Sequence, residues 1–144
     1  METINLFELK KLQTSFPKRN ITNSQSSADF IRQFYGDDIE IFESFFILML
    51  NVKLETIGYA KISQGGVVST IVDVRILCKY AVESLCTSCI IAHNHPSGNL
   101  KPSTADEMLT NKVKNALELF DIRLQDHIIL TKESYYSFDD NFKI

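Results

Sequence analysis

Uninterrupted apolar runs along the chain predict the strands of a sheet. Residues 44–50 are apolar after their first position and rich in aromatic and branched side chains, which is typical of a strand buried on both faces. A shorter apolar run at residues 88–92 has the same character. Three further strands are predicted at residues 55–62, 122–130 and 135–138. The first two strands in the chain are close enough to form an antiparallel hairpin.

Apolar residues at intervals of three or four positions predict three helices. The first covers residues 27–35, the second runs from Ser69 or Thr70 to Leu85, and the third covers residues 104–120. The side chains expected to face the core are Val72, Ile76, Tyr80 and Leu85 in the second helix and Leu109, Val113, Ala116 and Phe120 in the third. Helices and strands in this order predict an α/β fold with a mixed sheet and helices on its faces.

The N-terminal part of the chain is expected to lie outside this domain. Its few apolar residues form only a weak helical stripe, which Pro17 terminates, so a partly ordered arm is the better interpretation. The polar run at residues 20–27 is typical of a linker. We therefore divide the chain into an arm and linker at residues 1–26 and one domain at residues 27–144.

Composition and charge narrow the class of protein. Of the 144 residues, 44% are hydrophobic and 23% are charged. A chain of this kind suits one globular domain that buries about two thirds of the surface of its unfolded state. The formal net charge is −3, and the 15 basic residues are spread along the chain rather than clustered. We therefore expect no direct binding of nucleic acid and no association with an anionic membrane.

The chain also has no sequence feature of export. No stretch approaches the roughly 18 uninterrupted apolar residues of a membrane span, and the N-terminus has no apolar segment of the signal-peptide kind. The three cysteines, Cys78, Cys86 and Cys89, are an odd number and suit a reducing compartment better than a disulfide framework. We therefore expect a cytoplasmic protein.

One short segment concentrates the candidate chemistry. His93 and His95 follow an apolar run, and both imidazoles can bind one ion because residues i and i+2 of a strand point to the same face. Asp106 arrives eleven residues after His95, at the start of a predicted helix. Three such ligands leave the fourth position of a catalytic zinc ion to water. The simpler interpretation is that the histidines lie on the surface and that Ser103 and Asp106 only form a helix capping box.

The motif resembles the signature of a known family. Residues 93–98 read His-Asn-His-Pro-Ser-Gly, and Ser103 and Asp106 follow. This is similar to the RadC-like branch of the JAB/MPN metallopeptidases, in which His-x-His precedes seven residues, a serine, two residues and an aspartate. Residues 96–102 supply the seven. The resemblance covers about residues 27–144.

The resemblance implies both a fold and a metal site. The fold is a three-layer α/β/α domain of the cytidine-deaminase type. The metal is a zinc ion bound by His93, His95 and Asp106, with a water completing the coordination. A glutamate from an earlier strand is the implied general base. Glu43 is the choice, because Glu-x-Phe before an apolar run is the pattern of the family, and Glu40 is the alternative.

The implied reaction is hydrolysis of a peptide or isopeptide. Zinc lowers the pKa of its water and polarises the amide carbonyl, while Glu43 passes the proton to the leaving amine. Ser103 is expected to donate a hydrogen bond to the oxyanion, and it can cap the helix as well. A metal-binding scaffold without turnover is the second function class. The family also carries a DNA-repair name, and its longer members have an upstream helix-hairpin-helix domain that would contact DNA. We expect no such domain in a chain of this length, so we do not extend the DNA-repair role to it.

Other polar residues near the motif have simpler interpretations. Cys86 and Cys89 could close a structural zinc site with the histidines, but a helix end and an apolar strand favour buried thiols. His127 lies in a predicted strand and is interpreted as a packed histidine with a satisfied ring nitrogen, with a role behind the ligands as the alternative. Asn94 and Ser97 are expected to shape the loop rather than to contact substrate.

Overall fold

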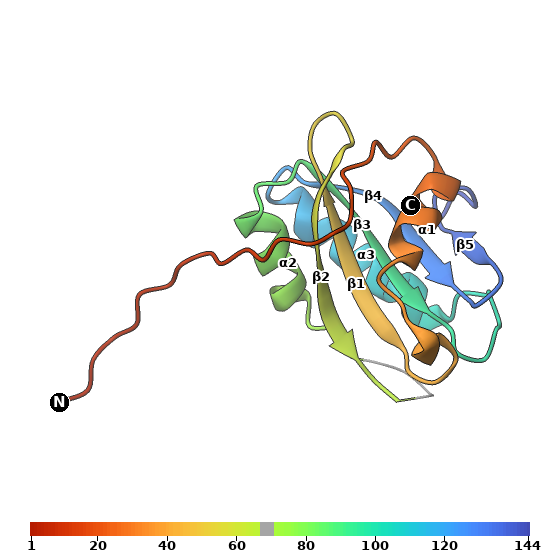
Figure 1. Ribbon diagram of the computed structural model, residues 1–144, viewed down its shortest axis with the longest axis horizontal. Coiled ribbons are helices and arrows are strands. Elements are labelled where there is room, and N and C mark those ends of the chain that lie inside the picture. The colour runs from red at the N-terminus through yellow and green to blue at the C-terminus, as the bar shows by residue number, and fades with distance from the viewer. Residues whose placement is uncertain (67–70) are drawn as a thin grey trace.

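The computed structural model describes residues 1–66 and 71–144 (Figure 1). The elements within these residues are α1 (Ser24–Arg32), the 3-10 helix η1 (Asp37–Glu40), β1 (Ser44–Leu50), β2 (Thr56–Gln64), α2 (Val74–Glu83), β3 (Ser88–Asn94), α3 (Thr104–Glu118), β4 (Arg123–Leu130) and β5 (Tyr135–Ser137). All predicted strands are present, with ends displaced by two residues or fewer. The start predicted for the second helix, Ser69 or Thr70, lies outside the described residues. No helix in the described part of the chain is both long and apolar enough to cross a membrane.

The strands form one mixed sheet in the order β2-β1-β3-β4-β5. β1 pairs antiparallel with β2 on one side and with β3 on the other. β3 pairs parallel with β4, and β5 pairs antiparallel with β4. A parallel pair requires a crossover connection, which α3 provides. The residues of β1 and β3 are buried throughout, as expected for strands at the centre of a sheet.

Helices cover both faces of the sheet and give three layers, with α1 on one side and α2 with α3 on the other (Figure 1). Phe45 of β1 packs in one apolar cluster with Leu77 of α2 and Leu117 of α3. Leu48, which points to the opposite face of the same strand, packs in a second cluster with Ile31 of α1. Burying each such side chain contributes about 1.5–3 kcal/mol. The predicted three-layer α/β fold is confirmed.

The first helix begins earlier than the sequence pattern predicts. The Asn23 side chain accepts a hydrogen bond from Ser26 N at 2.8 Å, and Ser26 Oγ accepts one from Asn23 N at 3.0 Å. This reciprocal capping box fixes the start of α1. Ile21 is already buried, so the linker predicted at residues 20–27 is wrong. Residues 1–15 are exposed and form no helix, and Figure 1 shows them leading away from the sheet.

The inward faces predicted for α2 and α3 are partly wrong. α2 buries Leu77 and Ala81, whereas the predicted Ile76 is 42% exposed and Leu85 is 85% exposed. Phe120 is 53% exposed, because α3 ends before it. Successive residues lie about 100° apart around a helix, so a helix with two adjacent apolar stripes could bury either one, and the sequence pattern does not show which. Contact with the sheet, which the sequence does not show, selects between them.

Candidate metal centre

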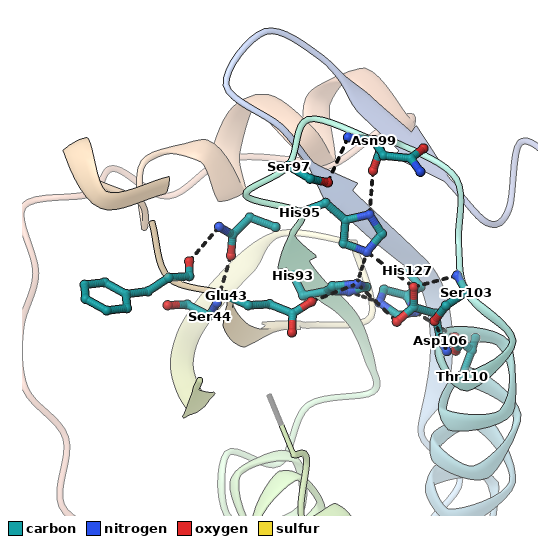
Figure 2. A network of polar contacts seen from close by, with 12 residues as sticks. Glu43, Ser44, His93, His95, Ser97, Asn99, Ser103, Asp106, Thr110 and His127 are labelled. Carbon is teal, nitrogen blue, oxygen red and sulfur yellow. Dashed lines mark hydrogen bonds and ion pairs between the residues drawn. The ribbon is translucent and has the colours of Figure 1, made fainter. Parts of the chain in front are cut away.

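The topology brings the ends of three elements together. β1 runs antiparallel to β3, and Phe45 lies opposite His93 in their register. The start of β1 therefore lies beside the end of β3, which places Glu43 near the histidines. α3 follows the same end of β3 and brings Asp106. Figure 2 shows the side chains of Glu43, His93, His95 and Asp106 pointing toward one another.

Three side chains converge on one small volume. His93 Nε2 lies 3.0 Å from His95 Nε2. Asp106 Oδ1 lies 3.3 Å from His93 Nε2, and Asp106 Oδ2 lies 3.3 Å from His95 Nε2. His93 is 2% exposed, whereas His95 and Asp106 are partly exposed. The centre is therefore closed on the side of the sheet and open on the side of the loop.

A tight turn after β3 sets the orientation of His95. Pro96 and Gly98 occupy the second and fourth positions of this turn, where each is favoured, and the N–H of Gly98 donates to His95 O at 3.0 Å. Gly98 has a φ of +85°, which residues with a Cβ rarely adopt. His95 Nδ1 lies 2.6 Å from Asn99 O. A carbonyl oxygen only accepts, so in the neutral ring Nδ1 carries the hydrogen and Nε2 directs its lone pair at the centre.

Asp106 is held by the start of its own helix. The Ser103 hydroxyl oxygen accepts from Asp106 N at 3.0 Å, and Ser103 N donates to Asp106 Oδ2 at 2.9 Å. The capping box suggested by the sequence is therefore present, and it orients the carboxylate toward the histidines instead of excluding it from the site. Ser103 is exposed, and its hydroxyl acts only as an acceptor in this box, so its hydrogen is left for another partner.

Glu43 lies at the edge of the centre. It is 8% exposed, and its Oε1 lies 3.8 Å from His93 Nε2. Backbone hydrogen bonds join Glu43 to Gly65 and Gly66, which fixes the chain just before β1. Glu40, the alternative base, lies in η1, is exposed and pairs with Lys132 at 3.5 Å. The structure therefore brings Glu43 to the histidines, and it engages Glu40 in an ion pair with Lys132.

Asn94 controls the segment that carries Glu43. Its amide nitrogen donates to Ile39 O at 2.6 Å and to Phe42 O at 2.8 Å, and its amide oxygen accepts from Ser44 N at 2.8 Å. The sequence predicted that Asn94 shapes its own loop. Instead, Asn94 shapes the segment before β1. Ser97 acts locally as predicted: its hydroxyl oxygen accepts from the N–H of Asn99 at 3.3 Å.

Electrostatic interactions within the centre favour a cation. Burial alone would raise the pKa of Asp106, but contacts with His93 and His95 outweigh it and hold the pKa of this carboxyl well below its usual value. The Asp106 carboxylate in turn raises the pKa of His95. Burial is the main cause that lowers the pKa of His127, behind the centre, so this ring is neutral. The centre therefore places an ionised carboxylate beside the two imidazole rings, and its negative charge favours a cation there.

The arrangement fits a small divalent ion. In tetrahedral coordination at about 2.0–2.1 Å from the metal, neighbouring ligand atoms lie about 3.3 Å apart. The separations of 3.0 and 3.3 Å among His93, His95 and Asp106 are close to this value. Glu43, His93 and His95 also offer ligand atoms that lie within 4.8 Å of one another. Two carboxylates thus border the histidine pair, and that of Asp106 is the nearer.

Sequence reasoning underestimated one residue and missed another. His127 is 0% exposed, and both of its ring nitrogens have partners: Nε2 lies 2.8 Å from His93 Nδ1, and Nδ1 lies 2.6 Å from Thr110 Oγ1. The packed-histidine interpretation is therefore correct but incomplete, since one partner is itself a candidate ligand. Thr110 was detectable in principle, because it follows Asp106 by four residues and so lies on the same face of α3.

The cysteines do not belong to this centre. Cys86 and Cys89 lie in the apolar cluster between the sheet and the helices α2 and α3. Cys89 precedes His93 by four positions in β3, a distance of about 13 Å along a strand. Burial raises the pKa of both thiols, which disfavours the thiolate that binds zinc. The alternative structural site with two cysteines and two histidines is not formed.

Comparison with known proteins assigns most of the chain to one kind of domain. Residues 21–143 match the family model described as RadC-like JAB domain. A UPF0758 protein of Flavobacterium johnsoniae is 41% identical over 122 residues, which cover 85% of this chain and 52% of the relative. A UPF0758 protein of Porphyromonas gingivalis is 39% identical over 126 residues, which cover 86% and 55%. The chain thus spans about half the length of these curated relatives.

Proposed function

Because the chain belongs to the family of RadC-like JAB domains, we propose that it is a zinc-dependent hydrolase that cleaves the amide bond of a peptide or isopeptide. The observation that carries this proposal is the convergence of His93 Nε2, His95 Nε2 and the Asp106 carboxylate beside the buried Glu43. Three protein ligands of this kind are the set that catalytic zinc sites use. The amide substrate follows from the resemblance of the motif to metallopeptidases.

His93, His95 and Asp106 are the residues that would hold the ion. Imidazole nitrogens with one carboxylate suit zinc among the first-row metals. When bound, zinc supplies a water of lowered pKa and polarises the substrate carbonyl. Asp106 is assigned as the third ligand because its oxygens lie 3.3 Å from both Nε2 atoms, whereas Glu43 Oε1 lies 3.8 Å from His93 Nε2.

Glu43 is assigned as the general base. It accepts a proton from the attacking water and delivers it to the leaving amine, a role that typically contributes about 10²–10⁴-fold to the rate. Its side chain is buried beside His93, and Asn94 anchors the backbone before it and after it through Phe42 and Ser44. The base is therefore held in one place, with its Oε1 3.8 Å from His93 Nε2.

Ser103 is assigned to the oxyanion. Its hydroxyl lies at the exposed start of α3, next to Asp106, and the capping bond uses only the oxygen as an acceptor. The hydroxyl hydrogen can therefore be donated to the substrate oxygen as charge develops there. Removing one such donor commonly lowers kcat by about 10²–10³-fold.

The test measures zinc content and hydrolysis of a peptide and isopeptide library side by side. Glu43→Gln should retain zinc, because the amide is nearly isosteric and the three ligands are unchanged, but turnover should fall by about 10²–10⁴-fold. Asp106→Asn should lose zinc affinity first and activity as a consequence. Glu40→Gln is the matched control: it removes an exposed carboxylate of the same chemistry and should change neither measurement.

Two results would revise the proposal in different ways. Loss of zinc from Glu43→Gln as complete as from Asp106→Asn would make Glu43 a ligand and leave the reaction without a base. Wild-type protein that binds zinc but cleaves no member of the library would favour a metal-binding scaffold.

A further inference from the structure

Behind the two histidines a chain of hydrogen bonds runs through the interior from α3 to β3. Thr110 Oγ1 donates to Asp106 O at 2.7 Å and lies 2.6 Å from His127 Nδ1. His127 Nε2 lies 2.8 Å from His93 Nδ1. Figure 2 shows this group beside the candidate metal centre. Neither Thr110 nor His127 has a part in the chemistry assigned above.

The direction of each bond in this chain follows from counting hydrogens. A threonine hydroxyl has one hydrogen, and Thr110 gives it to a backbone carbonyl that can only accept. Toward His127, Thr110 Oγ1 must therefore be the acceptor, so His127 Nδ1 carries a hydrogen. A neutral imidazole has only one N–H, so His127 Nε2 is the acceptor. His93 Nδ1 then carries the hydrogen of its ring, and His93 Nε2 is left with a lone pair.

The surroundings of His127 keep its ring neutral. The residue is 0% exposed, and its ring stacks on Phe138 at 4.5 Å between centroids with an interplanar angle of 13°. Phe45 meets it edge to face at 5.8 Å. A charged imidazolium between two aromatic rings would lose its hydration without compensation. It would also donate from both nitrogens and reverse the bond to His93.

We propose that His127 and Thr110 are positioning residues that fix the ring hydrogen of His93 on Nδ1 and so keep its Nε2 lone pair available to a divalent cation. The proposal rests on the proposed function only in treating His93 as a zinc ligand. Histidine ligands usually donate their second N–H to a carboxylate or a carbonyl, whose direction is fixed. Here the acceptor is a neutral imidazole, so the direction depends on Thr110 one step further back.

The first experiment measures the tautomers directly in the metal-free full chain. The chain has three histidines, and all of them, His93, His95 and His127, lie in this group, so ¹⁵N-labelled histidine gives a spectrum of the centre alone. In the neutral rings, nitrogen shifts and long-range couplings should place the hydrogen of His93 and that of His127 on Nδ1. His93 with its hydrogen on Nε2 would overturn the proposal, whether or not the protein binds zinc.

The second experiment measures Zn²⁺ affinity by competition with a chromophoric chelator. Thr110→Val is isosteric and removes the acceptor for His127 Nδ1–H. His127 then keeps a bonded hydrogen only by moving it to Nε2 and donating to His93, which transfers the His93 hydrogen to Nε2. Zinc affinity should fall by about 10–100-fold, the usual effect of losing a partner of a ligand. Thr131→Val, at a buried threonine whose hydroxyl bonds to Ser134, is the matched control and should not change it.

Two substitutions of His127 complete the series. His127→Phe removes the acceptor altogether and should reduce zinc affinity at least as much as Thr110→Val. His127→Gln offers an amide oxygen to His93 and an amide N–H to Thr110, so it should restore both the tautomer of His93 and the affinity. If His127 had a merely structural role, His127→Phe and His127→Gln would instead have similar zinc affinities.

The outcomes separate this inference from the proposed function. Zinc affinity and a His93 tautomer unchanged in Thr110→Val would refute the positioning role, even with an active enzyme. Absence of zinc binding by the wild type would refute the metal site but leave the tautomer measurement valid. A His127→Phe variant that fails to fold leaves the isosteric Thr110→Val to decide.

Discussion

Asn94 is the single side chain on which the position of Glu43 depends most directly. It follows His93 in β3 and therefore points to the opposite face of the sheet. It is 0% exposed, yet it makes three hydrogen bonds, to Ile39, Phe42 and Ser44. Successive residues of one strand thus serve different parts of the centre: His93 faces the candidate metal centre, and Asn94 faces the backbone on either side of Glu43.

Asn94→Ala should destabilise the protein by about 1–3 kcal/mol or more. The substitution leaves the buried N–H of Ser44 and the partly buried carbonyls of Ile39 and Phe42 without a side-chain partner, and a buried unsatisfied group costs about 1–3 kcal/mol before relaxation. Urea denaturation measures the free energy of unfolding. Asn111→Ala, at an exposed position of α3, is the control and should stay within about 0.5 kcal/mol of wild type. A similar small effect at both positions would mean that Asn94 does not fix this segment.

The residues close together in sequence could be predicted, and those brought in by strand pairing could not. The spacing of His93, His95 and Asp106 signals one site because a strand end, a turn and a helix start are local features. Glu43 needed a family pattern, since its place depends on the antiparallel register of β1 and β3. His127 depends on the parallel register that sets it opposite Ile91. No pattern within a single strand contains that information.

At the scale of elements, a buried carboxylate ties β4 to the chain that follows β5. Asp126 Oδ1 accepts from the N–H groups of His127 and Asp139 at 2.7 and 2.9 Å, and Oδ2 accepts from Ser137 Oγ at 2.6 Å. Burial is the main cause that raises the pKa of Asp126 to about 6, and the nearby Asp139 adds to it, although the three hydrogen bonds act in the opposite direction.

Asp126 should make the protein less stable as pH rises through the range between its two pKa values. In the unfolded chain the carboxyl has a pKa of about 3.9, so between that pH and about 6 the folded state binds more protons than the unfolded state. The contribution to the free energy of unfolding therefore falls with pH, by at most about 3 kcal/mol, and the loss is complete above the folded pKa.

Urea denaturation at a series of pH values checks this sign. Asp126→Asn keeps an acceptor for the two N–H groups and can donate to Ser137, so its stability relative to wild type should increase as pH rises from about 4 to 7. Glu133→Gln, at an exposed carboxylate in the turn between β4 and β5, is the control and should show no such trend. A constant difference between Asp126→Asn and wild type would show that Asp126 keeps its ordinary pKa in the fold.

Strands were easier to predict than helix faces for a physical reason. A central strand is buried on both sides, so its position shows as a continuous apolar run, and β1 and β3 were found in this way. A helix is buried on one side only, and the apolar residues of α2 are spread over more than one stripe. The sheet buries Leu77 and Ala81 and leaves Ile76 exposed. The polar residues before α1 were interpreted as a linker, although they cap the helix. The same polar side chains occur in helix caps and in solvated linkers, so their presence does not distinguish the two.

At the scale of the whole molecule, zinc binding and folding should be coupled. The centre joins β3, the turn after it and the start of α3, so binding of an ion there would require these parts to be assembled. Zinc at about 100 times its Kd should add about 2.7 kcal/mol to the free energy of unfolding. For a domain of this size the Tm should rise by about 5–10 °C.

Thermal denaturation with Zn²⁺ and with a chelator measures this coupling. The chelator should remove the zinc-dependent increase in the Tm of the wild type. Asp106→Asn should show little increase in Tm at the same zinc concentration. A wild-type Tm that does not respond to either reagent would argue against the metal site, because no ion bound by the folded state can leave its stability unchanged.

The crossover from β3 through α3 to β4 has an evolutionary consequence. Every side chain assigned to hold the cation or to orient its ligands, from His93 to His127, lies within this one continuous βαβ segment, Ser88–Leu130. Glu43 alone comes from a separate part of the chain, just before β1. A lineage can therefore inherit the ability to bind metal as a unit and lose catalysis by a single substitution at Glu43. Within such a family, enzymes and metal-binding proteins without activity would share one architecture and differ at one residue.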